Sequence, residues 1–180
     1  IVVAPLNDSA LRAPVKAAVQ AKIPVVVFDS DLQGDDHVSF VATDNLKGGQ
    51  LGGERLAETM KGKGKVVLLR YAEGHDSTAK REDGFLEAIK AHPEIEVVSS
   101  NQYVGTDVEG AYKKAESILS GLKNPDGSLG VDGIFCANES SSFAAMRVLK
   151  DNGWAGKLHF VGFDSSDNLV KGLQDGTLDG

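Results

Sequence analysis

Three absences narrow the class of protein. The sequence has a single cysteine, Cys136, so no internal disulfide can form. The cysteine count therefore does not distinguish an oxidising from a reducing compartment. It has no excess of positive charge, because 19 Lys and Arg residues stand against 26 Asp and Glu residues, a formal net charge of -7. This balance argues against nucleic acid or an anionic membrane surface as the main partner. No apolar run approaches the roughly 20 residues of a membrane span, so we expect no membrane insertion.

Motifs for catalysis and for metal binding are also missing. The sequence contains no HExxH, no G-x-S-x-G, no Walker A loop and no CxxC pair. Its four histidines lack the spacing of metal ligands. The glycines of residues 48–53 differ in spacing from a dinucleotide-binding loop and fall inside a predicted helix, where we expect them to allow close helix packing. We therefore predict no catalytic residue, no metal and no cofactor.

What the sequence does contain is a regular alternation of β-rich and helical segments. Its 180 residues correspond to slightly more than one domain. Residues 25–28 and 66–69 are continuous apolar runs, which are typical of parallel strands buried on both faces. The predicted strands cover residues 1–4, 24–28, 38–42, 65–69, 95–98, 133–136 and 158–162. The predicted helices lie near residues 9–21, 45–60, 77–91, 107–122, 140–152 and 167–174. This order predicts an α/β fold with right-handed crossovers.

The two ends and one internal loop suggest how the chain is divided. The sequence opens directly on the apolar run 1–4 and closes on residues 177–180, which resemble the start of another strand. We interpret it as an excerpt from a longer chain. The polar stretch 31–37 interrupts the alternation and separates a short first part from a longer second part. We expect this stretch to lead into a crossing between two domains.

Polar side chains follow almost every predicted strand. Ligands of open α/β sheets bind beyond the carboxyl ends of the strands, so these side chains are candidates for a site. Asp29 and Ser30 follow one strand, Asn138 another and Asp164 a third. Such residues also serve as helix N-caps. We expect a ligand role for Asp29, either role for Asn138 and Asp164, and capping for the remaining junction residues, namely Asp8, Ser9, Ser77, Ser140 and Ser166.

Arg81 and several aromatic residues complete the candidate set. Arg81 lies early in a predicted helix, where a cation opposes the helix dipole. Its guanidinium is either a five-donor fork aimed into a cleft or one half of a surface salt bridge with neighbouring carboxylates. Two carboxylates, a guanidinium and an amide suit a sugar, because each hydroxyl both donates and accepts hydrogen bonds. Phe163, with Tyr71 or Tyr103, could cover the apolar face of a sugar ring, and core packing is the alternative for all three.

Four regions of the sequence, in this order, resemble the periplasmic sugar-binding proteins of the ribose-binding type. They are the strand that ends in Asp29 (23–30), the helix start with paired glycines (43–49), the segment that carries Arg81 (77–85), and the two strand ends with Asn138 (137–139) and Asp164 (161–164). The resemblance covers essentially the whole chain. The wider superfamily also includes the effector-binding domains of LacI-type repressors.

The sequence departs from this family at two positions. The family often has Arg where this chain has Ser30, so one cationic donor is missing. An aromatic residue is frequent in the loop that follows the strand ending near Val98, and Tyr103 is the residue here that could take its place. These departures bear on the identity of the sugar.

The resemblance implies a two-lobed periplasmic-binding-protein type I fold, with parallel sheets flanked by helices and the ligand between the lobes. Residues 1–41 would be the C-terminal part of the N-terminal lobe, and residues 42–180 most of the C-terminal lobe. The expected ligand-binding residues are Asp29, Ser30, Arg81, Tyr103, Asn138, Phe163 and Asp164.

The implied function is that of an extracytoplasmic solute-binding protein of an ABC-type importer. Such a protein closes by hinge motion on a monosaccharide or similar polyol and presents it to the permease transmembrane subunits. This interpretation implies a periplasmic or extracytoplasmic location, no nucleic acid partner and no enzymatic activity. The alternative is the effector-binding domain of a LacI-type transcription regulator, and an enzyme on a doubly wound fold is a third hypothesis. One Arg against two Asp leaves no excess positive charge for a phosphate or a dicarboxylate.

Overall fold

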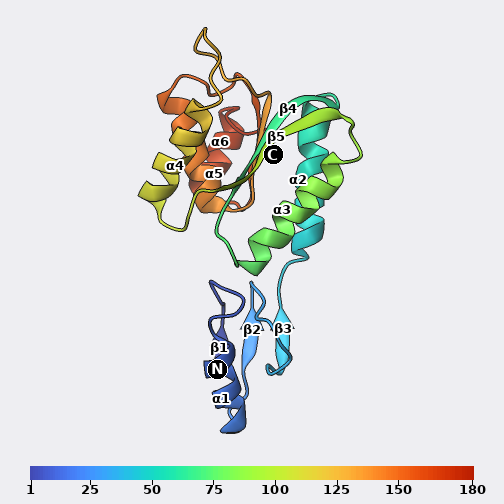
Figure 1. Cartoon of the computed structure of the whole chain (residues 1–180), viewed down its shortest axis with the longest axis vertical. Coiled ribbons are helices and arrows are strands. Elements are labelled where there is room, and N and C mark those ends of the chain that lie inside the picture. The colour runs from blue at the N-terminus through green and yellow to red at the C-terminus, as the bar shows by residue number, and fades with distance from the viewer.

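The computed structural model describes residues 1–180, which form two α/β parts (Figure 1). The first part has a three-stranded parallel sheet in the order β1-β2-β3, made by β1 (Val2–Val3), β2 (Val26–Phe28) and β3 (Ser39–Val41). Its one helix is α1 (Arg12–Gln20), which contributes Val15 to a small apolar cluster on the sheet. The chain then passes through residues 42–44 into the second part.

The second part is built on a four-stranded parallel sheet in the order β5-β4-β6-β7. Its strands are β4 (Lys63–Arg70), β5 (Glu94–Tyr103), β6 (Gly133–Cys136) and β7 (His159–Val161). One face is covered by α2 (Asn45–Thr59) and α3 (Asp76–Ile89). The other is covered by α4 (Val108–Ser120), α5 (Glu139–Asp151) and α6 (Asp167–Gln174), as Figure 1 shows.

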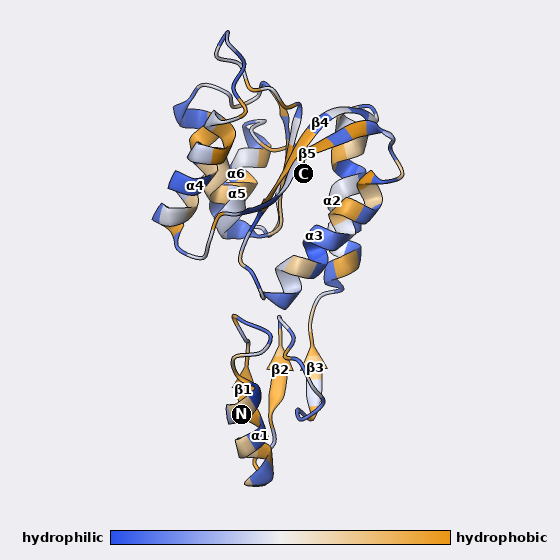
Figure 2. Cartoon of the chain, in the orientation of Figure 1, coloured by the Kyte–Doolittle hydropathy of each residue, from blue (hydrophilic) through white to orange (hydrophobic).

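Strand β4 shows how one apolar run serves two cores. Val66 and Leu68 pack in the cluster that contains residues of α2 and α3. Val67 and Leu69 alternate with them and pack in the cluster that contains residues of α4, α5 and α6. All four side chains are fully buried, and the apolar strands lie between helical layers in Figure 2. The prediction of a strand buried on both faces is confirmed for residues 66–69. In the run 25–28, Val25 and Val27 are buried but Phe28 is 45% exposed.

All seven predicted strands and all six predicted helices are present, with boundary differences. The largest difference is in β5, which was expected to end near Val98 but continues to Tyr103. Residues 101–103, expected in a loop, extend the pairing with β4 as far as the pair Arg70 and Tyr103. The polar side chains of this segment hide the strand in the sequence, because backbone pairing with β4 and not an apolar pattern sets its length.

Most of the expected N-caps are wrong. Helix α1 begins after Leu11, and α3 begins after His75, so Ser77 lies inside α3 with its side chain buried. Helix α5 is capped by Asn138 in place of Ser140. Ser166 does occupy the N-cap position of α6, but its hydroxyl makes no capping hydrogen bond. The backbone at each strand exit fixes where the helix starts, and a count of cap-forming residue types does not determine it.

The glycines of α2 allow a close contact with α3. A Cβ at Gly49 would overlap the carbonyl group of Arg81, and a Cβ at Gly84 would overlap the carbonyl group of Leu46. The two helix backbones therefore approach more closely than side chains would permit. The prediction of close helix packing at residues 48–53 is confirmed, and the contact fixes the part of α3 that carries Arg81.

Candidate functional site

Polar side chains meet in a cavity of about 180 Å³ at the carboxyl ends of the strands. Strand exits after β2, β4, β6 and β7 all contribute to it, together with the first turns of α3. Its lining residues are Asp29, Tyr71, His75, Ser77, Thr78, Arg81, Asn138 and Asp164. This is the edge at which ligands of open α/β sheets bind, so we take it as the candidate site.

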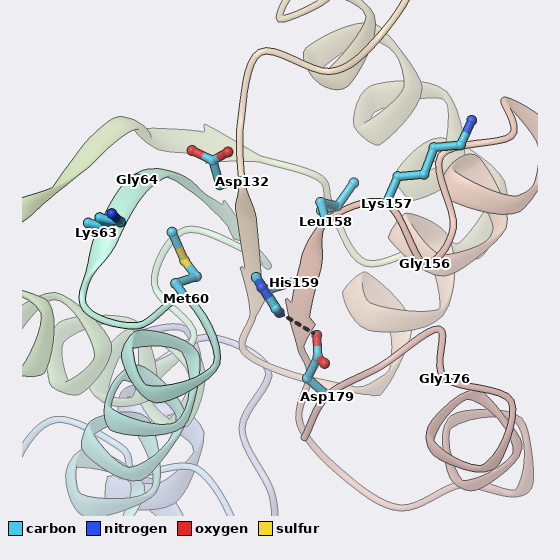
Figure 3. Close-up of a pocket in the computed structure, with 10 residues that line it drawn as sticks. All are labelled: Met60, Lys63, Gly64, Asp132, Gly156, Lys157, Leu158, His159, Gly176 and Asp179. Atoms are coloured by element: carbon cyan, nitrogen blue, oxygen red, sulfur yellow. Dashed lines mark ion pairs between the residues drawn. The ribbon is translucent and has the colours of Figure 1, made fainter.

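A larger cavity, of about 600 Å³, lies at the opposite end of the second sheet (Figure 3). It is lined by residues at or near the starts of β4 and β7, among them Lys63 and His159. The His159 Nδ1 atom lies 3.3 Å from Asp179 Oδ2. Because the amino ends of the strands line it, this cavity is not where the sheet geometry directs a ligand.

Arg81 is the central group of the candidate site, and its side chain is only 8% exposed. Its Nε donates to Asn45 Oδ1 at 2.8 Å, and its Nη1 donates to the carbonyl oxygen of Ala137 at 3.0 Å. The Phe163 ring centroid lies 3.9 Å from the guanidinium carbon, a cation–π contact. These contacts hold the guanidinium plane in one orientation, while no hydrogen bond within the chain uses Nη2. Burial lowers the pKa of Arg81 and nearby carboxylates oppose this, but Arg stays charged in proteins.

Asp29 and Asp164 share an unusual backbone conformation. Their φ angles are +66° and +72°, in the left-handed region that non-glycine residues rarely adopt. The two other such residues, Lys22 and Lys61, follow the ends of α1 and α2, where this conformation commonly terminates a helix. The aspartates instead follow strands and line the cavity. Strain of this kind concentrates at functional sites.

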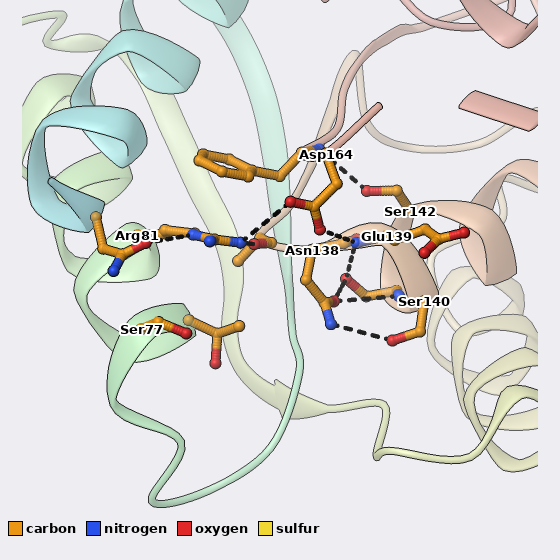
Figure 4. A network of polar contacts seen from close by, with 12 residues as sticks. Ser77, Arg81, Asn138, Glu139, Ser140, Ser142 and Asp164 are labelled. Carbon is orange, nitrogen blue, oxygen red and sulfur yellow. Dashed lines mark hydrogen bonds and ion pairs between the residues drawn. The ribbon is translucent and has the colours of Figure 1, made fainter. Parts of the chain in front are cut away.

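The carboxylate of Asp164 joins two elements of the site (Figure 4). Its Oδ2 accepts a hydrogen bond of 2.8 Å from the backbone N–H of Glu139, at the start of α5. Its Oδ1 lies 3.7 Å from Arg81 Nη1. The carboxylate of Asp29, in contrast, receives no hydrogen bond from the chain and remains a free acceptor in the cavity.

Asn138 caps α5 and also lines the cavity. Its Oδ1 accepts hydrogen bonds from the backbone N–H of Ser141 at 3.2 Å and from the Ser141 hydroxyl at 2.6 Å, which caps α5. Its Nδ2 donates to Ser140 Oγ at 3.1 Å, as Figure 4 shows. Capping fixes the amide at the wall of the cavity. The same side chain therefore caps α5 and lines the site.

Three further predicted site residues do not line the cavity. Ser30 is buried, and its hydroxyl accepts a hydrogen bond of 3.2 Å from the backbone N–H of Ser77. Phe163 contacts the site only through the Arg81 guanidinium. Tyr103, at the end of β5, is 38% exposed with its ring centroid 5.8 Å from the Arg70 guanidinium carbon. The extension of β5 holds Tyr103 in the sheet ladder, outside the cavity.

Comparison with known proteins places this geometry in a family. A profile of the family described as periplasmic binding protein domain matches residues 1–180. The chain belongs to the periplasmic binding protein domain family. The predicted resemblance to periplasmic sugar-binding proteins of the ribose-binding type is confirmed. The family also agrees with the predicted periplasmic or extracytoplasmic location.

Individual members of the periplasmic binding protein family are similar over nearly all of this chain. The ribose import binding protein of Salmonella typhimurium is 31% identical over 178 residues, which are 99% of this chain and 57% of that protein. The periplasmic component of an ABC-type sugar transport system from Hahella chejuensis superposes with a TM-score of 0.91 and 32% identity, over 98% of this chain and 62% of that one. An ABC transporter solute binding protein from Agrobacterium vitis with bound D-fucose gives a TM-score of 0.89 and 34% identity, over 99% of this chain and 60% of that one.

These comparisons confirm the predicted fold class, with parallel sheets flanked by helices. They also show that the chain spans 57–62% of the length of these relatives. The relatives are named as binding and transport proteins, in agreement with the prediction that the chain is not an enzyme. None of the six helices combines the length and the apolar character that a membrane crossing requires. No group of three His, Cys, Asp or Glu side chains is arranged to hold a metal ion.

Sequence reasoning missed several residues of the site. Asn45, the first residue of α2, is buried and orients Arg81, but a single amide in a helix carries no motif. His75 and Thr78 also line the cavity without having been predicted to do so. Both residues follow β4, so their place at a strand exit was the available signal.

The two parts of the chain meet at the start of α3. The backbone N–H of Asp8 donates to the carbonyl oxygen of Gly74 at 2.9 Å. The backbone N–H of Asp31 donates to Asp76 Oδ2 at 3.3 Å. With the hydrogen bond between Ser77 and Ser30, these form three bridging contacts, and they bring Asp29 to the same cavity as Arg81.

Proposed function

We propose that the chain is the larger part of an extracytoplasmic solute-binding protein of an ABC-type importer, and that it binds a monosaccharide or similar polyol in the candidate site. In this proposal residues 1–41 belong to the N-terminal lobe and residues 42–180 to the C-terminal lobe. The ligand lies between them and hinge motion closes the lobes. The permease transmembrane subunits are the proposed partner of the closed form.

The observation that carries this proposal is the polar set around Arg81. A buried guanidinium with Nη2 uncommitted lies beside the Asp29 and Asp164 carboxylates and the Asn138 amide. Donors and acceptors thus alternate over a short distance, as neighbouring hydroxyl groups of a polyol require. The guanidinium faces two carboxylates, so a neutral ligand suits the site better than a phosphate or a dicarboxylate.

The relatives support the same ligand class. The Salmonella protein is named for ribose import, and the Agrobacterium structure contains D-fucose. Both are neutral monosaccharides. The relatives are transport proteins, so the regulator alternative is not favoured.

Calorimetry of the full-length protein tests the role of Arg81. The ligand is first found by a thermal-shift screen of pentoses, hexoses and polyols, in which a ligand at 100 times its Kd adds about 2.7 kcal/mol of stability. We expect Arg81→Ala to weaken binding by about 10- to 150-fold, because a charged hydrogen bond contributes roughly 1.5–3 kcal/mol.

The matched control for this experiment is Arg147→Ala, on the exposed surface of α5 and outside the site. It should bind as the unmodified protein does. Arg81→Lys keeps the charge but not the fork and should also bind weakly. Unchanged affinity in a folded Arg81→Ala protein would remove Arg81 from the site, and a screen without any sugar ligand would contradict the proposed function.

A further inference from the structure

His75 is a lining residue of the cavity that no predicted role explains. It lies directly before α3 and lines the cavity together with Asp29, Tyr71 and Arg81. Its ring meets the Tyr71 ring edge-on, with centroids 5.2 Å apart. The two rings therefore form one wall of the cavity. Of the aromatic candidates Phe163, Tyr71 and Tyr103, only Tyr71 lines it.

Hydrogen bonds on one side of the imidazole define its orientation. The Nδ1 atom lies 3.2 Å from Thr78 Oγ1 and 3.3 Å from Ser77 Oγ. The Thr78 hydroxyl donates its single hydrogen to the carbonyl oxygen of His75 at 3.2 Å. Its oxygen then accepts from Nδ1–H, with the Ser77 hydroxyl oxygen as a second acceptor, and we infer the neutral tautomer that carries its proton on Nδ1. This assignment leaves Nε2 as an acceptor that no donor of the chain reaches.

The groups around His75 favour its neutral form. Burial lowers its pKa, the Asp29 carboxylate raises it, the Arg81 guanidinium lowers it and the Asp76 carboxylate raises it, with a net lowering. The N-terminal end of α3 also disfavours a cation at this position. Tyr71 is the remaining titratable neighbour, and burial raises its pKa, so it stays neutral. Near pH 7 the imidazole is therefore uncharged and its Nε2 lone pair is available.

We propose that His75 is a specificity-determining residue of the site, whose Nε2 accepts a hydrogen bond from a ligand hydroxyl and makes binding sensitive to pH. The proposal rests on the proposed function, since it requires a hydroxyl-bearing ligand in this cavity. The Asp29 and Asp164 carboxylates are charged acceptors, whereas His75 Nε2 is an uncharged acceptor. Protonation converts Nε2 to a donor. A bound sugar thus competes with a proton for Nε2.

The sign of the pH effect follows from this competition. A ligand that binds only the neutral ring binds with full affinity above the pKa of His75 in the free protein. As the pH falls below that pKa, affinity decreases by about tenfold per pH unit at most, until the lower pKa of the bound state is reached. Because the pKa of His75 is lowered from its usual value near 6.5, the decrease belongs on the acid side of pH 6.5.

The test is calorimetric titration of the full-length protein with D-ribose and with D-fucose, each between pH 5.0 and pH 8.0. His75→Gln places an amide oxygen near the position of Nε2 and does not titrate. We expect it to keep most of the affinity and to lose the pH dependence. His75→Phe keeps a ring against Tyr71 but has no acceptor, and it should bind about two- to tenfold more weakly at pH 7.5.

His159→Gln is the matched control, because His159 lies at the opposite end of the second sheet. It should change neither the affinity nor the pH profile. A profile that stays flat in the unmodified protein, or that persists in His75→Gln, would overturn the proposal while leaving sugar binding intact. Failure of both sugars to bind the unmodified protein at pH 7.5 would contradict the proposed function for these ligands, and the His75 proposal with it.

Discussion

The two parts of the chain both carry residues of the site, but they differ in how many apolar side chains they bury. The first part buries a cluster of only four apolar residues, Val15, Val25, Val27 and Leu32. The second part buries clusters of 18 and 11 residues on the two faces of its sheet. Phe28 and Val41, in the first sheet, stay 45% and 64% exposed. Within these 180 residues, Asp29 therefore follows a sheet packed by one helix, whereas Arg81, Asn138 and Asp164 belong to a part whose sheet is packed on both faces.

This difference teaches where the geometry of the site comes from. Arg81, Asn138 and Asp164 are fixed by the second part alone, through helix packing, capping and a strained turn. Asp29 lies in the first part, which residues 42–44 and the bridging contacts at the start of α3 join to the second. The position of Asp29 in the site therefore depends on contacts between the two parts, and the experiments below probe that dependence.

The largest expected effect is loss of core packing in the second part. Phe85 stacks on Phe135 with ring centroids 4.4 Å apart, and both are fully buried. We expect Phe85→Ala to lower the free energy of unfolding by about 3–5 kcal/mol. Hydrogen exchange resolves the effect by segment, and protection should fall across β4, β6, α2 and α3.

The companion substitution is Val27→Ala in the first part. It should lower protection of β1 to β3 and leave the second sheet protected, since the two cores share no residue. Loss of protection in both parts from either substitution would show that they unfold as one unit and would break the comparison.

A smaller effect is expected from the contact between α2 and α3. Gly49→Ala introduces a Cβ that overlaps the carbonyl group of Arg81, and such overpacking costs about 1–3 kcal/mol. Because the shift displaces Arg81, sugar affinity should fall together with stability. The control is Gly121→Ala, where the nearest atom to an added Cβ is 3.4 Å away and no loss is expected. Equal behaviour of the two variants would show that the helix contact does not set the position of Arg81.

The smallest effect concerns the junction between the parts. Ser30→Ala removes the acceptor of the buried Ser77 N–H, which should cost about 1 kcal/mol of stability. Ser30 does not line the cavity, so affinity should fall only modestly. Calorimetry measures both quantities. A loss of affinity as large as that of Arg81→Ala would instead indicate direct contact of Ser30 with the ligand.

The sequence predicted elements well where short-range pattern decides them and poorly where pairing does. Residues 66–69 identify β4, because four consecutive apolar side chains indicate a strand that is buried on both faces. The end of β5 cannot be identified from composition, since residues 99–102 are polar and only their pairing with β4 makes them a strand. The same extension keeps Tyr103 out of the cavity. Cap positions failed for a related reason, because the backbone path before α3 places His75 and not Ser77 at the helix start.

The site was predicted in outline but not in its supporting contacts. Asp29, Arg81, Asn138 and Asp164 do converge, because parallel strands bring their carboxyl ends to one edge. Asn45 could not be found in the same way, because its partner Arg81 lies on another helix. His75 follows β4, so its place at a strand exit was the one signal available for it. Ser30 shows the opposite error, as the residue beside a site aspartate turns toward the other part of the chain.

The left-handed backbone at Asp29 and Asp164 limits how this site can be redesigned. At either position only a small set of residues can replace aspartate without backbone strain: glycine, asparagine and, less readily, histidine. Of these, asparagine alone keeps the shape of the side chain and an oxygen acceptor. Branched or bulky residues would have to distort the strand exit first. A new ligand preference is therefore more readily introduced at Tyr71 or His75, whose backbones carry no such restriction.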